Sequence, residues 1–392
     1  MKRIVKYLLI IFTFFICFNV HAEEIEGVLS KNIIMYNLND DEVIYEKNSN
    51  DRVNIASLTK IMTAIVSIEN IDDYNKSVLI TSDMLKDVTN DLSVAGFKVG
   101  DAVTYNDLLY GTLLKSGADA TNILAISISG SINNFVSLMN NKAKKLGMYN
   151  TSFSNTIGIE SEKHYSTAKD VAILLKYAFK NKKFREVFET EHYENGKYIM
   201  DGPLKRINTD ENNYVIGAKT GYTSKAGLCL ASIAKYNNIG YLLVTIGAPK
   251  DDPMQNIKDS KKIYEYFFKN YSYKEILNKN DTVVKVKTVY GKEYNIKSFD
   301  DVTMYLKNDI TKDDLIYKYD GDTLLKKGIK QDDKIGTYYI LYNNEILYKT
   351  NVYAPKDVKF DLFFFIKENI VQLTLILIII ILVISIIRIR KK

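Results

Sequence analysis

The 392-residue sequence has no tryptophan, only two cysteines and only three histidines. Two cysteines cannot form a disulfide scaffold, and 19 glycines are far too few for a collagen. A hydrophobic content of 46% is too high for a disordered chain. Long apolar runs occur only near the two ends, which excludes a polytopic transporter. A chain of this length can instead build a core without covalent cross-links.

The shortage of metal ligands argues against metal catalysis. Beyond residue 22 the chain offers only His164, His192 and Cys229, and these have no ligand spacing. A Ser-His-Asp triad would need one of the two histidines, and neither a Gly-x-Ser-x-Gly elbow nor a P-loop is present. His164 precedes an apolar periodic run and is interpreted as a capping or structural residue. We therefore expect no catalytic metal.

The N-terminus has the pattern of a secretory signal. Basic residues begin the chain, an apolar stretch runs from Tyr7 to Cys17, and Val20-His21-Ala22 places small residues at −3 and −1. This pattern predicts a signal peptide over 1–22 that is cut after Ala22. The alternative is an N-terminal membrane anchor. After cleavage Cys229 is the single cysteine, so no intramolecular disulfide is expected.

The C-terminus predicts a membrane anchor. The 18 residues 370–387 are almost entirely Ile, Leu and Val, and four of the five residues in 388–392 are basic. Such a run is near the lower limit for a spanning helix, and the basic tail marks the cytoplasmic side. The alternative, an amphipathic helix in the interface, fits poorly because no polar stripe is present. We expect a body outside the cytoplasm, held at the cell membrane by a single pass.

The net charge of +6 arises from the two ends of the chain. Lys2, Arg3 and Lys6 contribute +3 and the C-terminal tail contributes +4, which leaves −1 for everything between. The body is therefore essentially neutral. The apparent basicity reflects membrane insertion and gives no reason to expect nucleic-acid binding.

The body divides in two by pattern. From about 28 to 270, β-like runs at Val28 to Tyr36 and Gly240 to Gly247 flank a mainly helical middle, in which Val136 to Leu146 forms a helix ended by Gly147. This predicts a layered α/β (α+β) domain. Period-two runs then predict a small antiparallel β domain. These runs are Thr282 to Thr288, Val302 to Leu306, Tyr338 to Tyr342 and Ile346 to Tyr353, with a turn at Tyr290-Gly291-Lys292.

A serine and a lysine remain as candidates for chemistry. Ser57-Leu58-Thr59-Lys60 opens a helix-like stretch, and residues three apart share a helix face, so Ser57 Oγ and Lys60 Nζ can meet. A desolvated lysine can take the serine proton, and the start of a helix favours a developing oxyanion. The motif alone is weak, because Ser166 to Lys169 and Ser232 to Lys235 also match it. We interpret these two as a helix start and a strand.

Another candidate motif is the single Lys-Thr-Gly of the chain, Lys219-Thr220-Gly221, which precedes a β-like run at Gly227 to Ala234. A strand bearing this motif can pair with an extended peptide and bind its carboxylate. Gly221 leaves room for close backbone approach. A solvated lysine before a turn is the alternative reading of this segment taken alone.

Together, Ser57-Leu58-Thr59-Lys60, Ser116-Gly117-Ala118 and Lys219-Thr220-Gly221 resemble the three motifs of serine penicillin-recognising enzymes. Flanking segments, among them His164-Tyr165-Ser166-Thr167-Ala168, extend this resemblance to low-molecular-mass D-alanyl-D-alanine carboxypeptidases over most of the chain. The resemblance implies the penicillin-recognising serine-transferase fold with a second, small antiparallel β domain and a C-terminal transmembrane helix. The expected boundaries are a signal peptide at 1–22, a catalytic domain at 23–272, a β-rich domain at 275–357, a juxtamembrane linker at 358–369, an anchor at 370–387 and a basic tail at 388–392.

The resemblance also implies roles for individual residues. Ser57 would be the acylated nucleophile, Lys60 its base, and Ser116 a proton relay to the leaving amine. Lys219 and Thr220 would hold the terminal carboxylate of the substrate, Gly221 would leave room beside it, and the backbone N–H groups of Ser57 and Tyr222 would form the oxyanion hole. No cofactor or metal is implied. The reaction would remove the last D-alanine from a peptidoglycan pentapeptide stem, and β-lactams would acylate the same serine.

Ala118 departs from the middle motif, which usually reads Ser-x-Asn. The alternative match Ser131-Ile132-Asn133 lacks the family's flanks. Two other functions remain to be considered. A class A β-lactamase would need a Glu-x-x-Leu-Asn loop between the second and third motifs, and none is there. A catalytically weak wall-binding scaffold is suggested only by Ala118.

We predict that Ala118→Asn changes acylation. The family's amide contacts substrate and orients the lysine, and loss of a buried hydrogen bond costs about 1–3 kcal/mol. The variant should therefore acylate faster or bind more tightly than the wild type, measured with labelled penicillin. Equal rate and affinity would show that the missing amide does not limit this enzyme.

Overall fold

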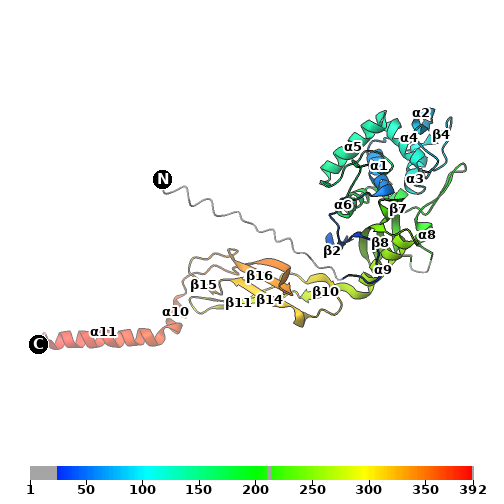
Figure 1. The fold of residues 1–392 in the computed structure, drawn as a ribbon. Coiled ribbons are helices and arrows are strands. Elements are labelled where there is room, and N and C mark those ends of the chain that lie inside the picture. Colours follow the sequence, from blue (N-terminus) through cyan, green and yellow to red (C-terminus); the bar gives the residue numbers. More distant parts are fainter. Residues whose placement is uncertain (1–23, 210–212, 391–392) are drawn as a thin grey trace, which may run out of the picture. The chain divides into compact units, whose positions relative to one another are not determined.

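The fold is described from a computed structural model, which describes residues 24–209 and 213–390. The predicted signal peptide and its cut site after Ala22 lie outside the described residues, as do Lys391 and Lys392 at the end of the basic tail. The chain divides into two compact units, with the division between Tyr266 and Phe267 (Figure 1). Each unit is described separately.

The first unit is built on a five-stranded antiparallel sheet in the order β2-β1-β9-β8-β7, in which β7 is an edge strand. Its strands are β1 (Asn32–Asn37), β2 (Glu42–Lys47), β7 (Val215–Thr223), β8 (Gly227–Tyr236) and β9 (Ile239–Ala248). Two small ribbons pair β3 (Ser77–Leu79) with β4 (Ala102–Thr104), and β5 (His192–Glu194) with β6 (Ile199–Asp201).

The first strand begins later than the sequence pattern predicts, at Asn32 rather than Val28. The backbone N–H groups of Leu29 and Ser30 donate to the carboxylate of Asp259 instead of to a neighbouring strand. This long-range contact ends the β pairing, and no local pattern could indicate it.

Helices cover both faces of the sheet. On β8, Cys229, Ala231 and Ile233 belong to the main core cluster, whereas the hydroxyl of Ser232 pairs with Tyr264 of α9 on the other face. Burial raises the pKa of the Cys229 thiol to about 12. The helices are α1 (Thr59–Ile68), α2 (Ser82–Leu85), α3 (Tyr105–Leu113), α4 (Ala118–Ser129), α5 (Ile132–Lys145), α6 (Ala168–Ala178), α7 (Lys182–Phe188), α8 (Leu204–Ile207) and α9 (Gln255–Asn270).

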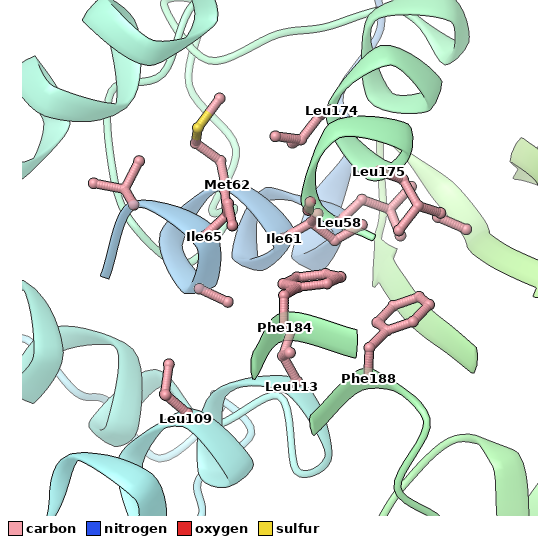
Figure 2. Close-up of a cluster of buried hydrophobic side chains, with 14 of the residues drawn as sticks. Leu58, Ile61, Met62, Ile65, Leu109, Leu113, Leu174, Leu175, Phe184 and Phe188 are labelled. Carbon is pink, nitrogen blue, oxygen red and sulfur yellow. The ribbon is translucent and has the colours of Figure 1, made fainter. Parts of the chain in front are cut away.

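Helix α1 lies at the centre of the first unit, and every one of its residues is buried. A helix that is buried on all sides needs packing neighbours on all sides. Figure 2 shows how α1 and the turn before it are surrounded by side chains from α3, α6 and α7. The labelled residues are Leu58, Ile61, Met62, Ile65, Leu109, Leu113, Leu174, Leu175, Phe184 and Phe188. This packing fixes the position of the α1 N-terminus.

The second unit is rich in β structure, as predicted, and its core gathers residues such as Val286, Leu325 and Ile340. Its three sheets are antiparallel except where β11 and β15 pair in parallel over two residues. The strands are β10 (Tyr271–Leu277), β11 (Thr282–Thr288), β12 (Glu293–Lys297), β13 (Val302–Lys307), β14 (Ile316–Gly321), β15 (Leu324–Leu325), β16 (Lys334–Tyr342) and β17 (Glu345–Tyr353).

Two helices end the described chain, α10 (Leu362–Glu368) and α11 (Ile370–Arg390). The short helix α10 occupies most of the segment expected as a linker. Within α11, the 20 residues Ile370–Ile389 are long and apolar enough to span a membrane, and none of that window is buried within the protein.

The turn that precedes α1 is tightly enclosed. It is a 3₁₀ turn, Ala56–Leu58, and Ala56 has a left-handed φ of 47°. A Cβ added to Gly158 would lie 2.0 Å from the Ala56 carbonyl oxygen, and one added to Gly221 would lie 2.9 Å from the Ser57 nitrogen. Only glycine at both positions lets the backbone approach this closely.

We predict that Gly158→Ala destabilises the protein much more than Gly130→Ala. Both glycines have left-handed φ values, 92° and 79°, so both variants carry a backbone cost of about 1–2 kcal/mol. A Cβ at Gly130 meets nothing within 4 Å, whereas Gly158 adds the clash with Ala56. Urea unfolding should show a further loss of about 1–3 kcal/mol for Gly158→Ala. Equal losses in the two variants would contradict the tight contact.

Candidate active site

Ser57 and Lys60 meet as their spacing predicts. Ser57 lies in the 3₁₀ turn that runs directly into α1, and Lys60 is in the first turn of α1 itself. The Lys60 amine donates to Ser57 Oγ at 3.0 Å and to the carbonyl oxygen of Ile157 at 2.8 Å. Lys60 is only 3% exposed. The hydroxyl therefore has a buried amine as its immediate partner.

Burial sets the protonation of Lys60. Desolvation lowers the pKa of its amine to about 7, against the opposing influence of the Asp119 carboxylate. Asp119 itself is buried and accepts backbone N–H bonds from Ala95, Gly96 and Phe97. Near neutral pH a substantial fraction of Lys60 is therefore uncharged and able to accept a proton.

Ser116 and Lys219 form a second hydroxyl–amine pair. Ser116 precedes α4 with a left-handed φ of 57°, and Lys219 comes from β7. The Lys219 amine donates to Ser116 Oγ at 3.0 Å and to the carbonyl oxygen of Thr220 at 2.8 Å. Lys219 is fully buried, and desolvation, the Lys60 cation and Arg206 together hold its pKa well below the usual range. The fold thus brings together side chains that are 103 residues apart.

The edge strand β7 borders an open cavity of about 450 Å3. Its lining includes Ser57, Ser116, Thr220, Gly221, Tyr222 and Arg206. Because Gly221 packs on the Ser57 turn, the strand edge and the hydroxyl open into the same space. The cavity combines a nucleophile, hydroxyl groups, cations and a free strand edge, which suits an extended peptide with a terminal carboxylate.

Ala118 is the first residue of α4 and lines a smaller cavity of about 110 Å3, which it shares with Ser57, Lys60 and Ser116. Its backbone N–H donates to the carbonyl of Ser93. Ala118 therefore lies beside the candidate catalytic residues, and its methyl group offers them no hydrogen bond.

The other sequence matches have structural roles. Ser131 Oγ caps α5 by accepting from Asn134 N–H, and it does not line either cavity. Thr167 begins α6 within the second Ser-x-x-Lys match, and the third match lies on β8, as predicted. His164 is buried, and burial lowers its pKa to about 4. Within residues 24–209 and 213–390, no three His, Cys, Asp or Glu side chains gather as metal ligands would.

Sequence reasoning missed several contributors to the site. Neither Asp119, which influences Lys60, nor Arg206 was singled out from the sequence. The carbonyl group of Ile157 carries no side-chain signal at all. The neighbouring Gly158 adopts a positive φ, and the presence of a glycine is the one signal that the sequence offers at this point.

Comparison with known proteins agrees with this geometry. A family model described as D-alanyl-D-alanine carboxypeptidase matches residues 18–250, and one described as the C-terminal domain of penicillin-binding protein 5 matches residues 271–359. The D-alanyl-D-alanine carboxypeptidase DacF of Bacillus subtilis is 31% identical over 84% of this chain and 86% of its own length.

Solved structures share the fold. Penicillin-binding protein 5 of Haemophilus influenzae superposes with a TM-score of 0.64 at 24% identity, covering 85% of this chain and 98% of that one. A Streptomyces DD-transpeptidase gives a TM-score of 0.58 at 27% identity, covering 62% and 98%. The chain therefore belongs to the D-alanyl-D-alanine carboxypeptidases, a family of serine penicillin-recognising hydrolases.

Proposed function

We propose that this enzyme removes the terminal D-alanine from peptidoglycan pentapeptide stems through an acyl-enzyme on Ser57. The observation that carries the proposal is the 3.0 Å contact between Ser57 Oγ and a buried Lys60 amine whose pKa lies near 7. A serine hydroxyl is a weak nucleophile until a nearby base takes its proton. Lys60 is the base in this position.

In the proposed acylation, Ser57 Oγ attacks the carbonyl carbon of the last peptide bond while its proton passes to Lys60. The oxyanion of the tetrahedral intermediate accepts from the backbone N–H groups of Ser57 and Tyr222. Collapse breaks the C–N bond, and a proton passes through Ser116 to the departing amine of D-alanine. Water then hydrolyses the Ser57 ester and restores the hydroxyl.

Binding of the substrate carboxylate would determine which of the two lysines is protonated. Both amines are buried, so two full positive charges here are unfavourable. A carboxylate bound by Lys219, Thr220 and Gly221 would raise the pKa of Lys219 and leave it as the charged partner. Lys60, farther from that carboxylate, would remain the neutral base.

The edge position of β7 supports a substrate orientation in which the terminal carboxylate lies near Lys219. An extended peptide can add to the free edge beside Gly221 and Tyr222, with its C-terminus toward Lys219. Ala118 supplies no amide to the acyl part of the substrate, so this backbone pairing would carry more of the binding. β-Lactams, which resemble the same dipeptide, would acylate Ser57 as well.

We also propose the division expected from sequence, with a catalytic domain at 23–272, a β-rich domain at 275–357, a linker at 358–369, an anchor at 370–387 and a tail at 388–392. The signal pattern at 1–22, the spanning length of α11 and the basic tail support a body outside the cytoplasm and a cytoplasmic C-terminus. The membrane is thus proposed as a partner, together with the stem peptide.

The full-length protein in detergent should be labelled covalently by a fluorescent penicillin and should release D-alanine from a peptide that ends in D-Ala-D-Ala. Ser57→Ala should lose both reactions. Ser131→Ala, which removes another serine hydroxyl from a matching Ser-x-Asn sequence, should retain both.

Other results of this experiment would indicate a different function or contradict the proposed site. Labelling without release of D-alanine would indicate a weak scaffold, and rapid turnover of penicillin without release of D-alanine would indicate a β-lactamase. Absence of labelling in the wild type would contradict the proposed site.

Acylation should also depend on pH through Lys60. Only the neutral amine can accept the serine proton, so the second-order rate of penicillin acylation should fall about tenfold per pH unit below pH 7 and level off above it. A stopped-flow series from pH 5 to 9 would measure this profile.

His192 provides the control for that profile. It is exposed, and its hydrogen bond to Asp201 raises its pKa above the ordinary value of 6.5, so its charge also depends on pH. Asp201 lines the larger cavity. His192→Asn should leave the profile unchanged if Lys60 is responsible, whereas loss of the pH dependence in that variant would assign it to His192.

A further inference from the structure

A chain of hydrogen bonds connects a buried histidine to the residue before Ser57. His164 Nε2 lies 2.8 Å from Thr59 Oγ1, and Thr59 Oγ1 donates to the carbonyl oxygen of Ala56 at 2.8 Å. His164, Thr59 and Ala56 are each no more than 1% exposed. No step of the proposed mechanism uses His164 or Thr59.

The direction of this chain follows from its ends. The backbone N–H of Ser154 donates to His164 Nδ1 at 3.1 Å, so Nδ1 must be an acceptor and the ring proton must be on Nε2. Nε2–H then donates to Thr59 Oγ1, and the Thr59 proton is free to donate to the Ala56 carbonyl. Burial lowers the pKa of His164 to about 4, which keeps the ring neutral over the range in which Lys60 titrates.

The end of the chain is the peptide unit that carries the proposed oxyanion donor. The Ala56 carbonyl and the Ser57 N–H belong to one planar peptide, and in a trans peptide these two groups point in opposite directions. A bond that fixes the carbonyl therefore also fixes the direction of the N–H. A hydrogen bond accepted by the carbonyl also polarises the peptide and strengthens its N–H as a donor.

We propose that His164 and Thr59 are positioning residues that act through the Ala56–Ser57 peptide to orient and strengthen the Ser57 N–H of the oxyanion hole. This inference rests on the proposed function of that N–H. Ala56 needs such support because its left-handed φ of 47° is unfavourable for a residue with a side chain.

The surroundings of the peptide limit other ways of holding it. Gly158 lies against the Ala56 carbonyl on one side, and Gly221 lies against the Ser57 nitrogen on the other. These contacts restrict how far the peptide can move, but a contact with a glycine exerts no directional pull. The Ala56 carbonyl accepts directional bonds from both the backbone N–H and the hydroxyl of Thr59, and the hydroxyl bond is the one that depends on the side chain.

The test compares two buried threonines of α1. Thr59→Val removes the hydroxyl that contacts Ala56, and Thr63→Val removes one that donates to the carbonyl of Thr156 at 2.7 Å. Both changes keep the side-chain shape, and Thr59→Val deletes two buried hydrogen bonds, to Ala56 and to His164, whereas Thr63→Val deletes one. We expect Thr59→Val to lower the rate of penicillin acylation by about tenfold or more, and Thr63→Val to change it by less than about threefold.

Two further measurements separate positioning from a loss of stability. Hydrogen bonds to an ester carbonyl lower its stretching frequency, so the infrared band of the acyl-enzyme formed with carbonyl-labelled penicillin should shift upward in Thr59→Val alone. Thr59→Ser, which keeps the hydroxyl, should restore both the rate and the band.

Variants of His164 test the first part of the chain. In His164→Gln the amide N–H can occupy the place of Nε2, whereas in His164→Asn the shorter side chain can meet only Ser154. The Gln variant should therefore acylate faster than the Asn variant. In a double mutant, His164→Asn should add little to Thr59→Val, because both break the same chain.

The outcomes distinguish this proposal from the function on which it rests. If wild-type protein is not acylated at all, the proposed function fails. If wild-type protein is acylated and Thr59→Val matches it in rate and carbonyl frequency, or if Thr63→Val shows the same losses as Thr59→Val, only the positioning role is overturned.

Discussion

The arrangement of this enzyme depends on keeping the Lys60 amine out of water beside Ser57. An ammonium group is strongly hydrated, so enclosing it lowers the pKa and requires compensating contacts. Those contacts come from three separate segments: the serine turn, the Ile157 carbonyl and, at longer range, the Asp119 carboxylate. Because α1 is buried on all sides, the helices around it are held in place by the same packing that encloses the amine.

A second constraint is shape. The turn bearing Ser57 is compressed between two glycines, one in the stretch after Asn155 and one on the edge strand. This close approach brings the nucleophile and the strand edge to one cavity, and Ser116, the partner of Lys219, lines it as well. Apolar packing alone could tolerate small shifts here, whereas the bonded networks around Lys60 and Asp119 define a single arrangement.

What the sequence could predict follows from the range of each interaction. The meeting of Ser57 and Lys60 is local, so a three-residue spacing was sufficient to predict it, and the strand at Thr282–Thr288 was visible from alternation alone. Ser116 and Lys219 are 103 positions apart, and their proximity was expected only from the family resemblance. The late start of β1, caused by Asp259, lay beyond any local pattern, whereas the helix α10 begins at a local cap, Asp361, that was not recognised within the expected linker.

The thiol of Cys229 has a practical consequence. It is the one cysteine among the described residues, it is fully buried in β8, and its raised pKa keeps it in the unreactive protonated form. Maleimide reagents, which react with accessible thiolates, should therefore leave Cys229 of the folded protein unmodified. A cysteine introduced at any exposed position would then be the sole attachment point for a fluorophore or spin label. The orientation of the two units, and the approach of the body to a bilayer, could be measured without first removing the natural cysteine.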